Sequence, residues 1–159
     1  GGDTLLEAFR HLPNSARAHL HLVTKTEGVG DGLPNVTVHR GVAPNSAPLL
    51  RLFADADLFV FPTRGDCLPL AVMEALAAGL PVVTTRVAAL PEAVAHGETG
   101  WVVPPDDPQA LADALALLIA DPALRARLGE QARAAALARF DPAIHYRRLV
   151  DTVKAVPHS

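Results

Sequence analysis

The middle of the chain contains a strand–helix–strand pattern that leaves few choices of fold. The run Leu58 to Phe61 and the pair Val82-Val83 are apolar without alternation, as in strands that are buried on both faces. Between them, residues 70–79 have a helical composition that ends at Gly79, and Pro81 precedes the next strand. Two strands joined through a helix pair in parallel. The pattern therefore predicts an α/β fold with the loop before the helix at one edge of the sheet.

The same alternation extends toward the amino terminus. Apolar residues at helical spacing open the chain, Thr4 and Glu7 have the spacing of a capping box, and Pro13-Asn14 provides a stop. Residues 19–23 and 36–39 have the composition of strands, and a Gly-rich loop separates them. These features predict one helix followed by two strands.

Further elements follow on either side of the central pattern. The second strand leads into the loop Gly41-Val42-Ala43-Pro44, and a short helix is expected after Asn45-Ser46. Glu92 opens another short helix, and Gly100 to Val103 reads as the last strand. Strands, loops and helices thus alternate, which is typical of a wound parallel sheet.

The composition changes to Ala, Leu and Arg from Asp106 onward. Three helices are expected there, each opened by an Asp-Pro pair, since Asp caps a helix and Pro fits its first turn. The pairs are Asp107-Pro108, Asp121-Pro122 and Asp141-Pro142. We therefore expect one domain over residues 1–159, a Rossmann-like wound parallel sheet flanked by helices, with a helical part from about residue 106.

Composition limits the classes of partner and compartment. The net charge is -3 and no run of Lys or Arg occurs, so a nucleic-acid partner is not expected. The single Cys cannot form an internal disulfide, and no signal-peptide pattern opens the chain. No apolar run approaches the roughly 20 residues of a membrane helix. We expect a cytoplasmic protein without a transmembrane segment.

The loop and helix from residue 65 to 74 combine groups that suit a nucleotide diphosphate. The stretch Cys67 to Leu70 lies at a helix start, where free backbone amides attract an anion, and Gly65 gives backbone freedom before it. Glu74 lies about one turn inside, and helical side chains lean toward the amino end, so its carboxylate can accept hydrogen bonds from hydroxyls there. Asp66 would approach the group beyond the phosphates.

Simpler roles fit the same residues. Asp66 suits a helix cap or a turn, and Glu74 suits a surface position near the positive end of the helix dipole. The neighbours of Glu74 are apolar, however, and a charge in such a setting needs a partner. That partner is a ligand, Arg64 or Arg86.

A longer set of residues resembles the donor-binding domain of family four retaining glycosyltransferases, which have the GT-B fold. The similarity spans nearly the whole chain, and its central block is highly specific. It rests on Phe61-Pro62-Thr63, Asp66 and Glu74 with seven residues between them, Ala75 to Val83, Leu90-Pro91-Glu92 and Gly97 to Pro104. The resemblance implies binding of a nucleotide-diphosphate sugar and transfer of the sugar with retention of configuration.

The resemblance also implies a role for each matching residue. Glu74 would hold the ribose, and Asp66, the candidate catalytic carboxylate, would contact the donor sugar near the reacting carbon. Gly41 and Val42 would lie against the base. Four residues of the intervening loop would line the phosphates: Cys67, Leu68, Pro69 and Leu70. No tightly bound cofactor or metal is implied.

The sequence departs from the family pattern at four places. Asp66 stands where the family usually has Glu, so its carboxylate is one methylene shorter. Cys67-Leu68-Pro69 replaces Gly-Phe-Gly, and Pro69 has no amide hydrogen. Ala88-Ala89 replaces paired glycines, and the loop 24–35 is short where many relatives carry a helix.

The resemblance starts after the strand that carries the family's basic phosphate-binding residues, and it includes no acceptor-binding domain. We therefore expect the donor-binding half of a transferase, inactive alone and dependent on an N-terminal acceptor-binding domain. The alternative is a nucleotide-sugar binding or interaction module without catalysis. A third hypothesis is a structural remnant that binds no nucleotide.

Other reactive residues carry weaker signals. Cys67 has no His at a suggestive spacing, so a bystander thiol is expected. His19 and His21 share a strand face, but without a third ligand no metal site is predicted. Glu92 either contacts the donor sugar or stabilises the start of its own helix.

Overall fold

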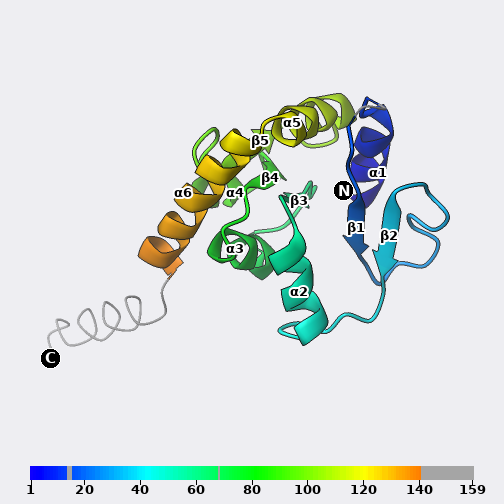
Figure 1. Ribbon diagram of the computed structural model, residues 1–159, viewed down its shortest axis with the longest axis horizontal. Helices are drawn as coiled ribbons and strands as arrows, with labels where there is room; N and C mark the ends of the chain where they lie inside the picture. Colours follow the sequence, from blue (N-terminus) through cyan, green and yellow to red (C-terminus); the bar gives the residue numbers. More distant parts are fainter. Residues whose placement is uncertain (14–15, 68, 141–159) are drawn as a thin grey trace, which may run out of the picture.

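The computed structural model describes residues 1–13, 16–67 and 69–140. Strands and helices alternate along most of the chain (Figure 1). In order they are α1 (Gly2–His11), β1 (Leu20–Val23), β2 (Val36–His39), α2 (Ala47–Asp55), β3 (Phe59–Phe61), α3 (Leu70–Ala77), β4 (Val82–Thr85), α4 (Leu90–Ala93), β5 (Gly100–Val103), α5 (Pro108–Ala120) and α6 (Pro122–Phe140). The predicted α/β class is confirmed. The expected third Asp-Pro helix, at Asp141-Pro142, lies outside the described residues.

The strands form two parallel sheets. β1 pairs with β2, and β3, β4 and β5 pair in that order, so β4 is central. Val83 of β4 lies opposite Val60 on one side and Trp101 on the other. The prediction of parallel strands flanked by helices is confirmed, but no hydrogen-bonded pairing joins β1 to β3 in the described part of the chain.

Helices cover the three-stranded sheet on both faces. Val83 and Val103 point into a cluster with α1 and α5, where Leu111 and Leu115 are buried. Val82 and Val102 point the other way, into a cluster with α3, α4 and α6. Leu22 of β1 belongs to the first cluster, so α1 and α5 connect the two sheets through one apolar core.

The first helix starts earlier than the capping-box spacing predicts. α1 begins at Gly2 after the N-cap residue Gly1, and no side chain caps it. Thr4 is therefore inside the first turn, where it is buried and its hydroxyl accepts a hydrogen bond from Arg64. The capping-box prediction is wrong because tertiary bonding uses the Thr4 hydroxyl.

The two later helices begin as predicted. Asp107 caps α5 by accepting the amide of Ala110 at 2.9 Å, and Asp121 accepts the amide of Leu124 at 2.9 Å before α6. Proline follows each Asp in the first helical turn.

Two glycines allow α6 to approach the end of α3. Gly79 has a φ of +79°, the left-handed conformation that ends helices. A methyl group at Gly129 would lie 2.3 Å from the carbonyl oxygen of Gly79, so the contact is backbone on backbone. Within the described residues, no helix is both long and apolar enough to cross a membrane.

Candidate functional site

Parallel pairing brings several loops to one edge of each sheet. The segments 62–69, 86–89 and 104–107 follow the carboxyl ends of β3, β4 and β5, and segment 40–46 follows β2. Ligands of open α/β sheets bind at this edge. Within the described residues, the predicted site residues lie in these loops or in the helix that follows β3.

The start of α3 has no side-chain cap. Its N-cap residue is Pro69, whose carbonyl oxygen accepts the amide of Val72 at 3.1 Å. Asp66 is exposed and lies three residues earlier, so the reading of Asp66 as the cap of this helix is wrong. The first turn of α3 thus presents its amides without a competing side chain.

Glu74 lies half-buried on α3 and faces α2. It lines a cavity of about 470 Å³ between the two helices, which is open to solvent on one side. The remaining wall is almost entirely apolar and consists of Asn45, Leu49, Leu50, Phe53, Ala54, Ala77 and Ala78. Glu74 is therefore the one charged group in the lining of this cavity.

Neither of the two arginines expected as partners of Glu74 forms an ion pair with it in the described residues. Arg64 contacts Asp3, Thr4 and Asp106, and no ion pair of Glu74 with Arg86 occurs among the described residues. The Glu74 carboxylate is consequently available to a ligand that enters the cavity.

The other predicted site residues lie outside the lining of this cavity. Asp66 and Cys67 are exposed in the loop, and Leu70 exposes 73% of its surface at the start of α3. Gly41 has a φ of +69° and precedes the half-buried Val42. Leu68 lies outside the described residues. The structure thus groups Glu74 with α2, and the roles of the remaining residues stay predictions.

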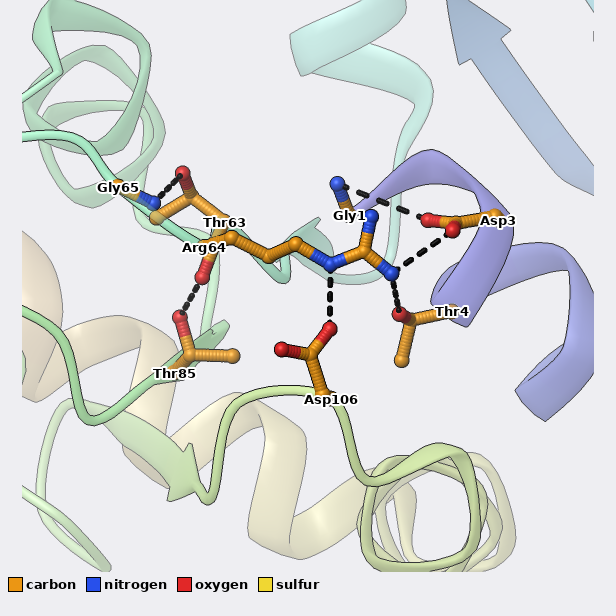
Figure 2. A network of polar contacts seen from close by, with 8 residues as sticks. All are labelled: Gly1, Asp3, Thr4, Thr63, Arg64, Gly65, Thr85 and Asp106. Atoms are coloured by element: carbon orange, nitrogen blue, oxygen red, sulfur yellow. Dashed lines mark hydrogen bonds and ion pairs between the residues drawn. The ribbon is translucent and has the colours of Figure 1, made fainter.

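Arg64, in the loop that follows β3, is the centre of a polar network (Figure 2). Its Nη2 donates to Asp3 Oδ2 at 2.7 Å and to Thr4 Oγ1 at 3.2 Å, and its Nε donates to Asp106. The hydrogen bond from Arg64 lowers the pKa of Asp3 to about 2, and the two carboxylates raise the pKa of Arg64. The guanidinium therefore stays charged between the two acidic side chains.

Three histidines lie together on the exposed side of β1 and β2. His21 Nδ1 lies 2.9 Å from His39 Nε2, and His19 Nε2 lies 2.8 Å from Thr37 Oγ1. Burial, followed by the charges of His19 and His39, lowers the pKa of His21. In the described ranges, no group of three or more His, Cys, Asp or Glu residues is arranged to hold a metal ion.

The profile of the family described as "Glycosyl transferases group 1" matches residues 1–121. The chain belongs to this family. The D-inositol 3-phosphate glycosyltransferase of Corynebacterium glutamicum is 45% identical over 84 residues, which are 53% of this chain and 20% of that protein.

Several solved structures match almost the entire chain. The sucrose-phosphate synthase of Thermosynechococcus elongatus has a TM-score of 0.82 at 28% identity, covering 98% of this chain and 42% of that one. Anabaena HepE, in a complex with UDP, has a TM-score of 0.84 at 24% identity, with coverages of 98% and 45%. The fold is that of GT-B glycosyltransferases, and the chain spans less than half of each of these two structures.

Two features of this group 1 glycosyltransferase chain were missed by reasoning from the sequence. The spacing of Leu49, Leu50 and Phe53 predicted a helix but not that α2 forms a cavity wall opposite Glu74. Arg64 was considered only as a partner for Glu74, because residues as distant as Asp3 and Asp106 give no local signal of contact. The helical spacing was the available signal for the cavity, and no sequence signal marked the network.

Proposed function

We propose that the chain is the donor-binding half of a retaining glycosyltransferase, which transfers a sugar from a nucleotide-diphosphate sugar to an acceptor. The single observation that carries this proposal is the half-buried Glu74 carboxylate in an otherwise nearly apolar cavity. Pockets for small ligands typically combine an apolar lining with a few polar groups that fix orientation. The family membership supports the same reaction class.

The cavity supports binding of a nucleoside. Glu74 would accept hydrogen bonds from the two neighbouring ribose hydroxyls, since an ionised carboxylate has acceptors for both. Leu49 and Phe53 offer an apolar surface to the ribose or base. Gly41 and Val42, in the loop that leads toward α2, would contact the edge of the base.

The start of α3 supports binding of the diphosphate. Uncapped amides at a helix start favour an anion, and α3 begins one turn before Glu74. The loop residues Cys67 and Leu70 would contribute amides there, whereas Pro69 cannot. Asp66 would then lie beyond the phosphates, beside the donor sugar. HepE structures in complex with UDP and with UDP-glucose support a nucleotide sugar as the ligand class.

A further strand and an acceptor-binding domain would complete the enzyme. A parallel strand between β1 and β3 would join the two sheets in the order β2-β1-x-β3-β4-β5, which is the order of classic dinucleotide-binding folds. Gly1 lies against the carbonyl oxygen of Pro62, so a strand leading into Gly1 would run alongside β3. Reaction in the cleft between two domains would leave this chain inactive alone. The exposed Cys67 thiol favours a reducing compartment such as the cytoplasm.

Calorimetry tests the proposal. UDP, GDP, ADP and the corresponding sugar nucleotides would be titrated into the wild-type chain, Glu74→Ala, Glu74→Gln and the exposed control Glu130→Ala. We expect the nucleotides of one base to bind. Both Glu74 variants should lower the affinity for them at least about tenfold, because a charge-assisted hydrogen bond contributes roughly 1.5–3 kcal/mol. Equal affinities in wild type and Glu74 variants would contradict the assignment.

A nucleotide-sugar binding module without catalysis is the second candidate. The proline at the N-cap of α3, which has no amide hydrogen, and the exposed Asp66 favour it. A transfer assay with labelled donors on the full-length protein separates the two candidates. Product formation that Asp66→Asn abolishes favours the transferase, and nucleotide binding without product favours the module.

A further inference from the structure

One side chain in the loop after β3 joins three segments that are distant in sequence. Arg64 lies 61 residues from Asp3 and 42 residues from Asp106, and it hydrogen-bonds to both (Figure 2). These acids belong to the first turn of α1 and to the loop between β5 and α5. Arg64 thus connects the loop that precedes α3 with the amino ends of α1 and α5.

The partners of Arg64 are themselves held in place. Thr4, which accepts a bond from the same Nη2 as Asp3, exposes only 6% of its surface. Asp106 has a φ of +57° and directly precedes Asp107, the residue that caps α5. The guanidinium therefore contacts fixed points on the scaffold.

The main chain next to Arg64 is also held. The hydroxyl of Thr85 on β4 donates to the carbonyl oxygen of Thr63 at 2.6 Å, and the amide of Gly65 donates to Thr63 Oγ1 at 3.2 Å. The first bond holds Thr63 and the second holds Gly65, so Asp66 is the first residue beyond them. The direction in which Asp66 leaves the sheet is thus set by the segment that Arg64 anchors.

We propose that Arg64 is a positioning residue, which holds the loop between β3 and α3 so that Asp66 faces the donor sugar. This inference rests on the proposed function. Arg64 hydrogen-bonds to Asp3, Thr4 and Asp106 through two of its three nitrogens. It does not line the Glu74 cavity. Its effect should therefore fall on the sugar and not on the nucleoside.

A purely structural ion pair would behave differently. The side chain of Arg64 is 48% exposed, and exposed ion pairs add little to stability. Arg64→Ala should consequently fold, and its consequences should be local. Replacement by Lys should restore only part of the effect, because an ammonium group cannot present the two separate edges of a guanidinium to two acids.

Hydrogen exchange tests the positioning without any ligand. The amide of Gly65 is hydrogen-bonded to Thr63 Oγ1, so it reports on whether the loop stays in place. We expect this amide to exchange at least about tenfold faster in Arg64→Ala, with those of Val72 to Leu76 unchanged, since local opening raises exchange only where contacts are lost. Asp106→Asn should give a smaller increase at the same amide. The matched control is Arg127→Ala, an exposed Arg on α6. Unchanged exchange at Gly65 in both variants, Arg64→Ala and Asp106→Asn, would overturn the proposal.

Calorimetry on the same variants then assigns the effect to the sugar. UDP and UDP-glucose are the probes, or the ADP or GDP pair if the wild type binds that base more tightly. Arg64→Ala should weaken only the sugar nucleotide, by about fivefold, and adding Asp66→Ala should cost nothing more, because residues acting through one another are not additive. Equal weakening of both ligands overturns the positioning role alone. A wild type that binds no nucleotide overturns the proposed function as well.

Discussion

The two sheets of the molecule differ in how completely they are covered. All four residues of β4 are buried, and α5 beside it buries five residues. In β1 only Leu22 is buried, and α2 has no buried residue. The three-stranded sheet with α5 is a closed scaffold, whereas β1, β2 and α2 keep apolar surface open. That open surface includes the cavity wall opposite Glu74, so the region that is poorest in internal packing is the one proposed to bind ligand.

The largest expected effect comes from truncating a leucine in each region. Leu111 on α5 is fully buried, so Leu111→Ala should lower the free energy of unfolding by about 3 kcal/mol. Leu49→Ala on α2 should cost less than half of that, because Leu49 is only half-buried, but it should weaken nucleotide binding. Urea denaturation and calorimetry measure the two effects. Equal losses of stability in Leu111→Ala and Leu49→Ala would mean that the two regions are packed equally well.

Adding a methyl group tests the closure of the scaffold. Gly129→Ala should destabilise the protein by about 1–3 kcal/mol, because overpacking forces the backbones of α3 and α6 apart. Gly2→Ala is the matched control in another helix, where the added methyl group meets no atom within 4 Å. It should instead stabilise α1 by up to about 1 kcal/mol. Thermal unfolding of both variants would show the opposite signs, and a neutral Gly129→Ala would mean that the contact can relax.

A third substitution concerns the loop after β4. Ala88 has a φ of +46°, a conformation that side chains with a Cβ rarely adopt. Ala88→Gly should raise the free energy of unfolding by about 0.5–1 kcal/mol, since relief of this strain exceeds the added flexibility of the unfolded chain. Ala126→Gly, at an exposed position on α6, should have the opposite sign. Denaturation at equilibrium compares the two.

The smallest effect concerns protonation on the open sheet. The pKa of His21 lies below its ordinary value of 6.5 because of burial and the charges of His19 and His39, while Asp55 acts in the opposite sense. The unfolded chain therefore binds this proton first on acidification. The stability that depends on neutral His21 is present above pH 6.5 and is lost as the pH falls through the lowered pKa.

His21→Gln should flatten this part of the stability profile between pH 5 and 7. Urea denaturation at each pH measures it, with the exposed His11→Gln on α1 as the control. If the wild-type free energy of unfolding rises on acidification over this range, the pKa of His21 is not lowered in the folded state.

Local signals in the sequence predicted most of the fold. The apolar runs at Leu58 to Phe61 and at Val82-Val83, the Asp-Pro pairs and Gly79 each act within a few residues, so β3, β4, the helix starts and the end of α3 followed directly. The start of α1 was misplaced because the Thr4 hydroxyl bonds to a residue 60 positions away. The split between the two sheets was also not predicted, since strand order depends on pairing between distant segments.

The candidate site was predicted in part. Glu74 was identified from its apolar neighbours, and it does lie half-buried at a cavity. The opposite wall of the cavity, formed by α2, was not predicted, because the contact between α2 and α3 depends on how both helices pack on the sheet. The role of Asp66 stays a prediction. The contacts of Arg64 and Thr63 hold the main chain before it, but no recorded contact within the described residues fixes the direction of the Asp66 side chain itself.

The backbone contact between Gly79 and Gly129 joins α6 to the helix that carries Glu74. Thermodynamic linkage makes such a connection reciprocal. If docked α6 favours the ligand-bound form of α3, a nucleotide that occupies the cavity will protect α6 from proteolysis. Removal of α6 will then lower the affinity for the nucleotide by the same factor. The end of the described chain would then report on ligand occupancy from the side of the molecule that the ligand never touches.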